Sequence, residues 1–540
     1  MKIINYSILL LLLFFATSCS DVLEKSPLNE ISDDAFWNDP VLVSYYINDL
    51  YANLPLQQYQ LGESRTDNSV HSQRDKWRAS SFLYNYNLEN ADNPSEVTWR
   101  TSYENIRKFN RFLEKIELSS LSLEEINSYK GEVYFLRAFT YFELVKRYGG
   151  VVLLNEVLSL KDNWEIPRST EDETYDFIFQ DLKKACELLP DYWEGKDKGR
   201  ATKGAAWALR SRAALYNNRY DQAIEAAEEV YKFGYNLVPG QTPEQYRSIW
   251  WTTNKDNSEI IFDKQFSNPD VSNAMLIYHM VTYINDPYGD RGWGGLGPTQ
   301  NLIDQYELKD GSQAPQFSGK PETEIFDIHE SGIYENREPR FYASIVFHGA
   351  NIWLNGDKGP VAVDRYTMDT PDKGDGSMTG YNVWKWIDYD NYNYPYAGSS
   401  SKDHSINWIY FRLAEVILNE AEARVEKGDI TGALTAVNKI RSRVGLPNLT
   451  ETNQLKLREL IRKERRIELA FEDHRFWDIR RWRIGNKTNQ GVMSGVRFIS
   501  PTKFYISNTD TRTWDDRLYY HPIPRSEIVR MNVLEQNPGF

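Results

Sequence analysis

Residues 413–423 read Leu413-Ala-Glu-Val-Ile-Leu-Asn-Glu-Ala-Glu-Ala, and after a short connection Asp429-Ile-Thr-Gly-Ala-Leu-Thr-Ala-Val-Asn follows. Alanine recurs along both stretches, and small side chains let antiparallel helices approach closely. The same arrangement occurs earlier, where Ala205-Ala-Trp-Ala-Leu-Arg-Ser-Arg-Ala-Ala-Leu-Tyr is followed by Arg219-Tyr-Asp-Gln-Ala-Ile-Glu-Ala-Ala-Glu-Glu-Val. The sequence therefore predicts two helix pairs and a mainly α-helical fold.

This pattern is typical of tetratricopeptide-like helix pairs, which stack to form a scaffold. The two pairs lie about 200 residues apart, so they do not form one uninterrupted solenoid in the sequence. Residues 235–405 between them are richer in Gly, Pro, Asn and Asp, with short strand-like runs at Glu259-Ile-Ile-Phe and Ala343-Ser-Ile-Val-Phe. We expect a loop-rich, irregular insertion with short strands, where binding residues concentrate.

Helices are also predicted on both sides of the insertion. Apolar residues recur at helical spacing over 132–147, and a glycine pair at 149–150 ends that helix. Thr170 begins another helix, with Glu173 at capping-box spacing. The helix predicted over 455–482 is rich in arginine, but Glu and Asp interleave with it, which indicates ion-paired helix faces and not a nucleic-acid surface.

The amino terminus reads as a targeting device. One lysine precedes an apolar run over 8–16 that is too short for a bilayer core of about 30 Å. Small residues then precede Cys19, as in a bacterial lipobox, where the cysteine is acylated; the alternative is an ordinary secretory signal. We expect a signal peptide over 1–18, a lipidated Cys19 with a tether over 19–40, and a mature chain anchored to a membrane without crossing it.

Beyond the tether we expect three regions. An N-terminal helical region covers 41–234, the insertion over 235–405 binds the ligand, and a C-terminal helical region over 406–540 packs on the first. The 540 residues carry a formal net charge of −14. An acidic surface repels phosphate backbones, which makes nucleic acid a poor partner. Cys186 lies on an apolar helix stripe and is expected in the core.

No motif in the sequence supports a catalytic, metal-binding or dinucleotide-binding site. The seven histidines lie outside any HExxH or CxxC setting, and no GxSxG elbow occurs. Gly292-Trp-Gly-Gly-Leu-Gly matches GxGxxG formally, but Pro298 and the turn-like segment before it argue against a dinucleotide site. Asp369, Asp372 and Asp375 lack EF-hand spacing, so we expect a solvated turn. Neither a metal nor a cofactor is expected.

Aromatic residues make up 14% of the chain and gather in polar, turn-prone stretches. Residues 381–396 hold seven of them, where that average predicts about two. The faces of Trp and Tyr stack on the apolar C–H faces of sugar rings, while nearby Asp, Asn and Arg bind hydroxyl groups. The pattern favours an oligosaccharide-binding surface; the alternative is that these aromatics fill the insertion's own core.

Motifs over almost the whole mature chain resemble, in order, the SusD/RagB family of surface glycan-binding lipoproteins. They are Asp21-Val-Leu-Glu-Lys-Ser-Pro, Leu136-Arg-Ala-Phe-Thr-Tyr-Phe-Glu-Leu-Val-Lys-Arg-Tyr-Gly-Gly-Val, Gly199-Arg-Ala-Thr-Lys-Gly-Ala-Ala-Trp-Ala-Leu, Arg412-Leu-Ala-Glu-Val-Ile-Leu-Asn-Glu-Ala-Glu-Ala, Ile461-Arg-Lys-Glu-Arg-Arg-Ile-Glu-Leu-Ala-Phe-Glu-Asp-His-Arg-Phe-Trp-Asp, Pro522-Ile-Pro-Arg-Ser-Glu-Ile and Gln536-Asn-Pro-Gly-Phe.

The resemblance implies an α-rich fold with tetratricopeptide-like helix pairs and an irregular remainder that carries the ligand contacts. It also implies a non-catalytic lipoprotein of the outer-membrane surface that delivers oligosaccharide to a SusC-like TonB-dependent transporter. Because the matched motifs are mainly scaffold, ligand residues are assigned from regional correspondence and chemistry. Stacking platforms are expected at Trp77, Tyr288, Trp293 and Trp353, an outer platform at Tyr392, and hydroxyl partners at Asp67 and Arg78, whereas Trp99 is assigned to packing.

Three other functions compete with neutral-glycan binding. The same scaffold would bind peptides in one of them. A secreted glycoside hydrolase needs two carboxylates at a defined separation in space, which no spacing in the sequence establishes. A helical scaffold for protein partners alone would bind no glycan and would co-purify only with the transporter.

Overall fold

The fold is given by a computed structural model. The structure describes residues 31–55, 62–71, 91–92, 98–267, 271, 273, 275–279, 281, 294–353, 360–367, 376–387 and 405–540. The predicted signal peptide and Cys19 lie outside the described residues. Among the described helices, none is both long enough and apolar enough to cross a membrane.

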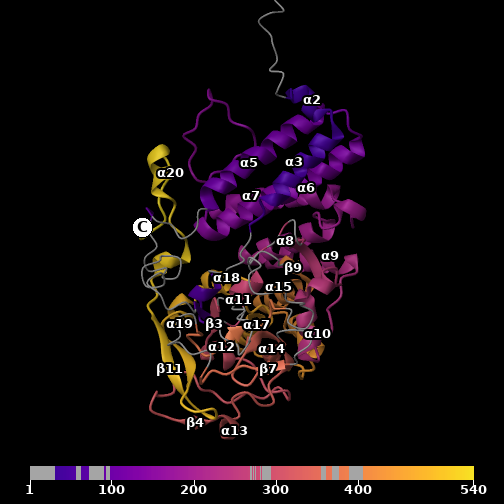
Figure 1. The fold of residues 1–540 in the computed structure, drawn as a ribbon. Coiled ribbons are helices and arrows are strands. Elements are labelled where there is room, and N and C mark those ends of the chain that lie inside the picture. The colour runs from indigo at the N-terminus through magenta and orange to yellow at the C-terminus, as the bar shows by residue number, and fades with distance from the viewer. Residues whose placement is uncertain are drawn as a thin grey trace, which may run out of the picture.

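The first half of the chain is a stack of helices (Figure 1). Ser122 and Thr170 begin α6 and α7 with capping boxes, as the sequence predicts for Thr170. Gly149, with φ of 71°, ends α6. Helix α6 packs against α5 and α7, and α7 packs on α8. The helices of this half are α2 (Asp33–Trp37), α3 (Pro40–Ala52), α5 (Thr98–Lys115), α6 (Leu123–Tyr148), α7 (Glu171–Leu188), α8 (Lys203–Tyr216) and α9 (Tyr220–Val230).

The two predicted helix pairs are present, and they adjoin in space. Helix α8 packs on α9, and α15 (Leu413–Glu426) packs on α16 (Ile430–Arg443). Helix α15 also contacts α8 and α9. Alanines on these helices, such as Ala213 and Ala421, are fully buried at the contacts. Pairs that are distant in the sequence therefore form one continuous scaffold, and the fold is mainly helical.

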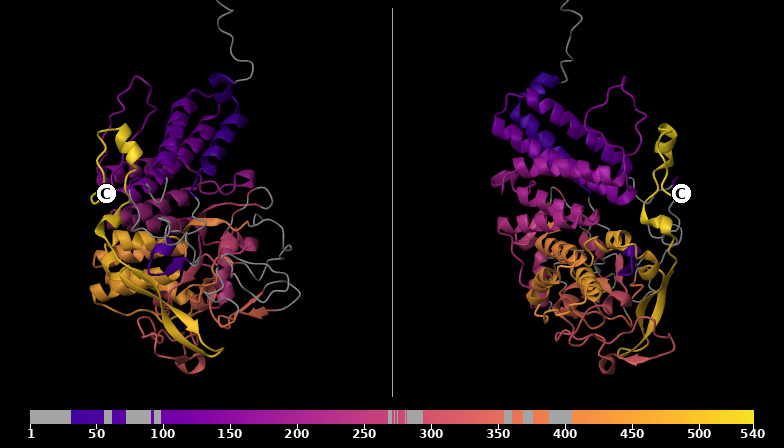
Figure 2. Two further views of the ribbon diagram at one scale, coloured as in Figure 1. Left: turned by 60° about the vertical axis from the view of Figure 1, so that its left-hand side comes forward. Right: turned by 180° about the vertical axis from the view of Figure 1, so that it is seen from behind.

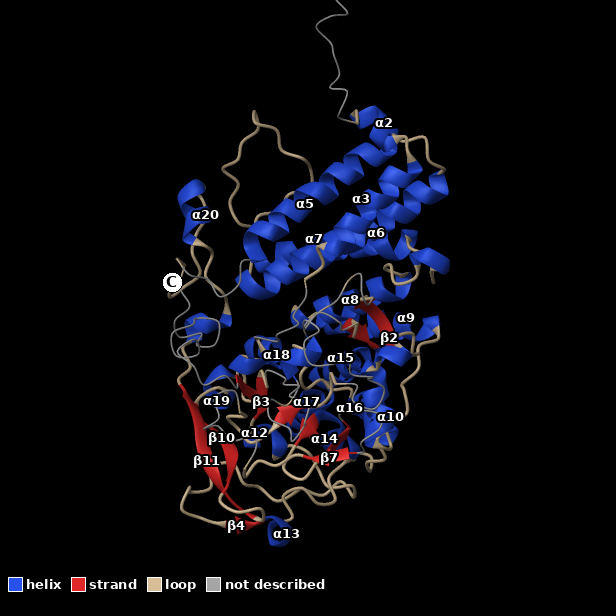
Figure 3. Cartoon of the chain, in the orientation of Figure 1, coloured by secondary structure: helices blue, strands red, loops and turns tan. Residues whose placement is uncertain are grey.

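Short strands and short helices, most of them from the insertion, lie beside and below the helix pairs in the view of Figure 3. All the strand pairs are antiparallel: β2 with β9, β5 with β8, β6 with β7 and β1 with β3. The strands are β1 (Ser69–His71), β2 (Ile260–Lys264), β3 (Leu296–Pro298), β4 (Phe326–Asp327), β5 (Ile345–Val346), β6 (Asn351–Trp353), β7 (Pro360–Ala362), β8 (Asn382–Val383) and β9 (Trp408–Arg412). The short helices are α10 (Pro243–Arg247), α11 (Met275–His279), α12 (Gln300–Ile303), α13 (Ile328–Ser331) and α14 (Pro339–Ser344).

The C-terminal part differs from the prediction at two places. The helix expected over 455–482 is broken into α17 (Gln454–Glu468) and α18 (Arg475–Arg481). Phe471 and Asp473 between them have φ of 64° and 63°, a left-handed conformation that no α-helix contains. After α19 (Gly485–Thr488), strands β10 (Gly491–Phe498) and β11 (Lys503–Arg512) form a hairpin that also pairs with β4 and that the sequence analysis did not predict. The last helix is α20 (Arg525–Arg530).

One hydrophobic core extends through both halves, from Trp37 to Leu534. Cys186 and Trp99 are buried in it, as predicted. Two further views show the N-terminal helices at one end and the insertion with most C-terminal elements at the other, while the last C-terminal helix, in yellow, lies level with the N-terminal helices (Figure 2). The helical scaffold therefore holds the loop-rich part at one end of the molecule.

Candidate ligand-binding face

Most of the predicted contact residues lie outside the described residues. The structure does describe the elements that flank the segments carrying them. Trp77, Arg78, Tyr288, Trp293 and Tyr392 lie outside the described residues. For Trp353 only the backbone, at the end of β6, is described. The site is therefore described through its anchors, the strands and buried residues at the ends of these segments.

Strands β1 and β3 anchor two of these segments at one point. Their antiparallel register pairs His71, the last residue of β1, with Leu296, the first residue of β3. Segment 72–90 leaves and segment 282–293 arrives at the same end of this ladder. Trp77 is six residues from His71, within about 20 Å of extended chain, and Trp293 is three residues from Leu296, within about 10 Å. Both predicted platforms therefore start from adjacent positions.

The two stretches that flank segment 282–293 approach each other closely. The Gly295 N–H donates a hydrogen bond to the Tyr278 carbonyl oxygen at 2.7 Å. A Cβ on Gly295 would lie 2.3 Å from the Tyr278 ring, so only glycine allows this approach. The ring centroid of His71 lies 6.0 Å from that of Tyr278. The residues that flank segment 282–293 and the end of β1 are thus held together.

A small hydrophobic cluster, separate from the main core, anchors the remaining segments. Val281, Ile352 and Ile387 are all buried in it. They directly precede segment 282–293, Trp353 and segment 388–404 in the chain. Three stretches that carry the predicted residues Tyr288, Trp293, Trp353 and Tyr392 therefore leave from one cluster.

The aromatic-rich run 381–396 is partly core. Tyr381, Trp384 and Trp386 are 0%, 7% and 0% exposed. Trp386 stacks on Trp408 with ring centroids 5.2 Å apart, and its Nε1–H donates to the Phe471 carbonyl oxygen at 2.7 Å. For these three residues the alternative interpretation, packing of the insertion, is correct. Tyr389, Tyr394 and Tyr396 lie outside the described residues.

Asp67 is a buried ion-pair residue. Its side chain accepts hydrogen bonds from Arg475 Nε at 2.8 Å and Nη2 at 2.9 Å, and Arg466 Nη2 lies 3.1 Å from Oδ2. Burial raises the pKa of Asp67, but the two guanidinium groups outweigh it and hold that pKa below its ordinary value. This geometry gives no support to the prediction that Asp67 binds ligand hydroxyls. Asp67 instead fixes the segment that leads into β1, where its carbonyl oxygen accepts from the Thr299 hydroxyl at 2.6 Å.

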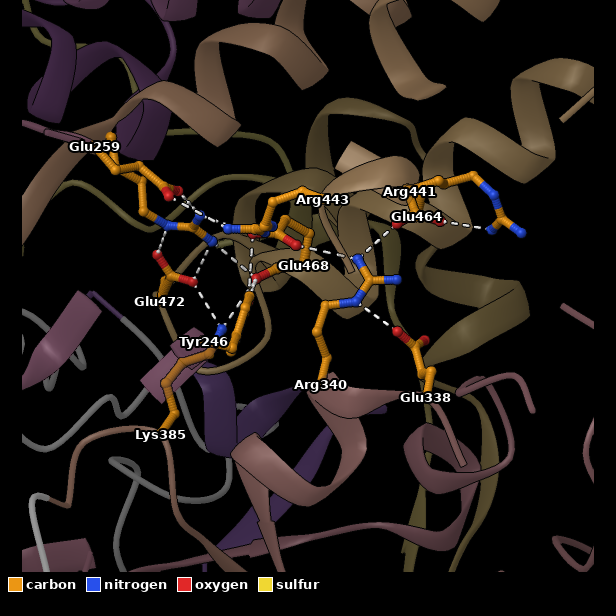
Figure 4. Close-up of polar contacts among 11 residues, drawn as sticks. Tyr246, Glu259, Glu338, Arg340, Lys385, Arg441, Arg443, Glu464, Glu468 and Glu472 are labelled. Atoms are coloured by element: carbon orange, nitrogen blue, oxygen red, sulfur yellow. Dashed lines mark hydrogen bonds and ion pairs between the residues drawn. The ribbon is translucent and has the colours of Figure 1, made fainter. Parts of the chain in front are cut away.

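A buried network of charges fixes the insertion to the C-terminal helices (Figure 4). Arg412 donates to Glu259, Glu468 and Glu472 at 2.7 Å each. From the insertion, Arg340 on α14 reaches Glu468 at 3.1 Å, and Lys385 reaches Glu472 at 2.8 Å. Burial opposes ionisation of Glu468, but Arg443, Arg412 and Arg340 together hold its pKa well below the ordinary value. These ion pairs therefore tie the insertion to the C-terminal helices at the base of the predicted ligand face.

The arginines of 455–482 are paired, as the interleaved charges predict, but several of their partners lie outside this stretch of sequence. Arg465 pairs with Asp478, and Arg481 pairs with Glu422 on α15 as well as with Asp478. Arg475 and Arg466 pair with Asp67, 408 residues from Arg475 in the chain. The interleaved charges were a signal for ion pairs, but nothing in them names a distant partner. Within the described ranges, no group of three or more His, Cys, Asp or Glu side chains is placed to hold a metal ion.

Comparisons with known proteins agree with this architecture. The sequence model of the SusD family matches residues 258–540, more than half of the chain, and the model described as starch-binding associating with outer membrane matches residues 21–215. The solved structure of a SusD-like protein from Bacteroides fragilis has a TM-score of 0.91 and 62% identity, covering 96% of this chain and all of that one.

Two more distant relatives cover nearly the same length. The structure of a SusD-like carbohydrate binding protein from Bacteroides fragilis has a TM-score of 0.75 and 24% identity, covering 92% of this chain and 99% of that one. SusD-like protein P25 of Formosa agariphila is 24% identical, over 99% of this chain and 98% of its own. The chain belongs to the SusD/RagB family, whose members bind glycans and are not enzymes.

Proposed function

We propose that the mature chain captures neutral oligosaccharide or polysaccharide on a face built from segments 72–90, 282–293 and 388–404. We further propose that it is anchored to the outer membrane by lipid on Cys19 and hands its ligand to a SusC-like TonB-dependent transporter. Family membership supports glycan binding in general. A similar solved structure is named as that of a carbohydrate binding protein.

The convergence of the anchors carries this proposal. The β1–β3 ladder and the cluster of Val281, Ile352 and Ile387 bring together the starting points of the segments that hold the predicted platforms. Trp and Tyr side chains from such segments would stack on the C–H faces of sugar rings, and Arg78 would bind hydroxyl groups. A rigid base with several converging loops is the arrangement on which binding residues are usually carried.

A Trp→Ala comparison tests the glycan-binding part. We expect one neutral polysaccharide from a panel to retard the soluble chain, starting after Cys19, in native gels. The panel includes laminarin, since a similar SusD-like protein is named for binding it. Trp293→Ala should abolish the retardation, because removing a central aromatic anchor from a binding site typically costs about 2 kcal/mol or more. Unchanged retardation of this variant would refute the assignment of Trp293.

Trp164→Ala is the matched control. Trp164 lies between α6 and α7 in the helical half, is 46% exposed, and its Nε1–H donates to the Ser159 carbonyl oxygen at 3.1 Å. This variant should bind like the wild type. If no polysaccharide retards any of the proteins, glycan capture by this face is refuted, and peptide ligands become the leading alternative.

The anchor and the transporter need a separate experiment in cells. We expect full-length protein to fractionate with the outer membrane and to co-purify with a TonB-dependent transporter. Cys19→Ala should be released from the membrane fraction, because acyl chains supply stable anchoring. Retention of Cys19→Ala in the membrane would contradict lipidation at this residue.

A further inference from the structure

A cationic groove lies beside the base of the predicted ligand face. It has a volume of about 760 Å³ and is lined mainly by α17, with contributions from α18 and the segment that leads into α19. Five of its lining side chains are cationic and two are acidic, in a chain whose net charge is −14. The cations are Lys456, Arg462, Lys463, Arg466 and Arg475.

Two of these cations are already neutralised at the rim. Arg462 approaches Glu459 at 3.4 Å and Glu426 at 3.6 Å, and Lys463 lies 2.9 Å from Glu307. Lys456 is exposed and has no ion pair among the described residues. The charge available to a ligand therefore comes from Lys456 and from the floor of the groove.

The floor holds two guanidinium groups and one carboxylate. Arg475 is 6% exposed and the side chain of Arg466 is 9% exposed, and both contact Asp67. Each uses Nε and Nη2 for its hydrogen bonds, and no described residue accepts from Nη1 of either. Two buried cations therefore share one counter-charge, and each keeps an unused donor group.

The other charges at this point do not balance the excess. Arg512 also faces Asp67, but it has Asp510 as its own partner at 2.9 Å. Burial raises the pKa of Glu63 to about 7, so it is only partly ionised at neutral pH. Asp478 also attracts Arg475, but it already pairs with Arg465 and Arg481. Burial and the neighbouring Arg475 lower the pKa of Arg466 to about 10. Among the described residues, the acids beside the floor therefore offset only part of the positive charge of its two arginines.

We propose that this groove binds a carboxylate of an acidic glycan, a uronic acid unit, through Arg466 and Arg475 with Lys456 at the rim. This inference rests on the proposed function and extends its ligand from neutral glycans to glycans that also carry uronic acids. Guanidinium forks match the geometry of carboxylates. The groove is far larger than a single ion needs, and its lining also includes Leu460 and Ile484, which offer apolar contact to a sugar ring.

The groove and the predicted stacking face lie within reach of one polysaccharide chain. Asp67 contacts both arginines at the floor, and His71, where segment 72–90 leaves, is four residues further along the chain, at most about 14 Å away. A glycan that stacks on the loops would therefore extend toward the groove. A neutral backbone with occasional uronic acids suits both surfaces.

The test compares acidic polysaccharides with their neutral counterparts. Homogalacturonan, alginate, hyaluronan and glucuronoxylan are each paired with their carboxyl-reduced form in affinity gels. We expect the wild type to bind at least one acidic form about tenfold more tightly than its reduced form, and this preference to weaken at high salt. The ratio of the two affinities is the readout, because a general loosening of the loops would weaken both forms equally.

Lys456→Glu and Arg466→Gln should reduce this ratio to about one. Lys456 is exposed, so its variant folds even if Arg466→Gln does not. Lys196→Glu is the matched control: Lys196 is exposed, lies outside the groove, and has no ion pair among the described residues, so its variant should keep the wild-type ratio. Comparing the affinities for dextran sulfate and for dextran shows whether the groove prefers a sulfate ester to a carboxylate.

Three results would overturn the proposal: no preference for any acidic form, a ratio that neither variant changes, or a preference confined to dextran sulfate. If the neutral forms are bound through Trp293 and the acidic and reduced forms are bound equally well, this inference fails while the proposed function stands. If no polysaccharide of either kind is retained, the proposed function fails with it.

Discussion

Glu63 is a buried carboxyl group that lacks a partner for one oxygen. Its Oε1 accepts hydrogen bonds from Asn68 Nδ2 at 2.8 Å and from the Phe471 amide at 3.2 Å. Its Oε2 has no hydrogen-bond partner in the described part of the chain. Burial raises the pKa of Glu63 to about 7; the two hydrogen bonds and Arg475 oppose this rise, while Asp473 adds to it. The folded protein therefore holds a proton on Glu63 that the unfolded chain releases near pH 4.5.

This proton gives a prediction with a definite sign. Between about pH 4.5 and 7 the folded state binds more protons at Glu63, so this residue makes the free energy of unfolding fall as the pH rises. Above pH 7 both states are ionised and no further loss occurs. Glu63→Gln removes the effect, so its stability relative to the wild type should rise by about 3 kcal/mol between pH 4.5 and pH 8. Urea unfolding at the two pH values measures it, and a pH-independent difference would contradict the account.

The environment of Asp67 could not be predicted from the sequence. Its polar neighbourhood in the sequence resembles that of a hydroxyl-binding residue, and no local pattern distinguishes it from a buried anchor. The deciding contact, with Arg475, spans 408 residues. The run 381–387 misleads for a related reason, because its polar residues Asn382 and Lys385 are buried along with the aromatics.

At the scale of elements, helix caps and alanine faces were predictable because their signals are local. Thr170 and Glu173 form the expected capping box, and both predicted helix pairs exist. The break between α17 and α18 was not predictable, since Phe471 and Asp473 adopt positive φ without being glycine. The turn lets Glu468 and Glu472 converge on Arg412, a tertiary requirement that helical spacing does not reveal.

The helix pairs should contribute stability and not affinity. Leu418 on α15 is fully buried, so Leu418→Ala should lower the free energy of unfolding by about 3 kcal/mol through lost apolar burial and a cavity. Glycan affinity of the folded variant should equal that of the wild type. Leu160→Ala, at a residue that is 98% exposed, is the control and should change stability by less than about 0.5 kcal/mol. Weakened glycan binding by folded Leu418→Ala would contradict a purely structural role.

At the scale of the whole molecule, the fold divides the work between two parts. The helical scaffold and the buried charge network hold the insertion, and the insertion gathers the ends of the predicted ligand segments. The mainly helical class and the loop-rich insertion were predictable from periodicity and composition. Their continuity in space was not, because the contacts of α15 with α8 and α9 join segments about 200 residues apart.

The sequence predicts which segments carry the ligand residues, but not that these segments start close together. Aromatics in polar stretches identified segments, while the register of β1 and β3 and the cluster around Val281 supplied the evidence that these segments start together. Neither the register nor the cluster has a local signature, since each joins residues from separate parts of the chain.

Hydrogen exchange of the soluble chain with and without its retained polysaccharide tests the central claim most directly. Backbone amides covered by a ligand, or held by it, exchange more slowly. The account predicts slower exchange in peptides from 72–90 and 282–293, with no change in α5 to α9. Slower exchange confined to the helix pairs, or none in those two segments while the polysaccharide is bound, would contradict it.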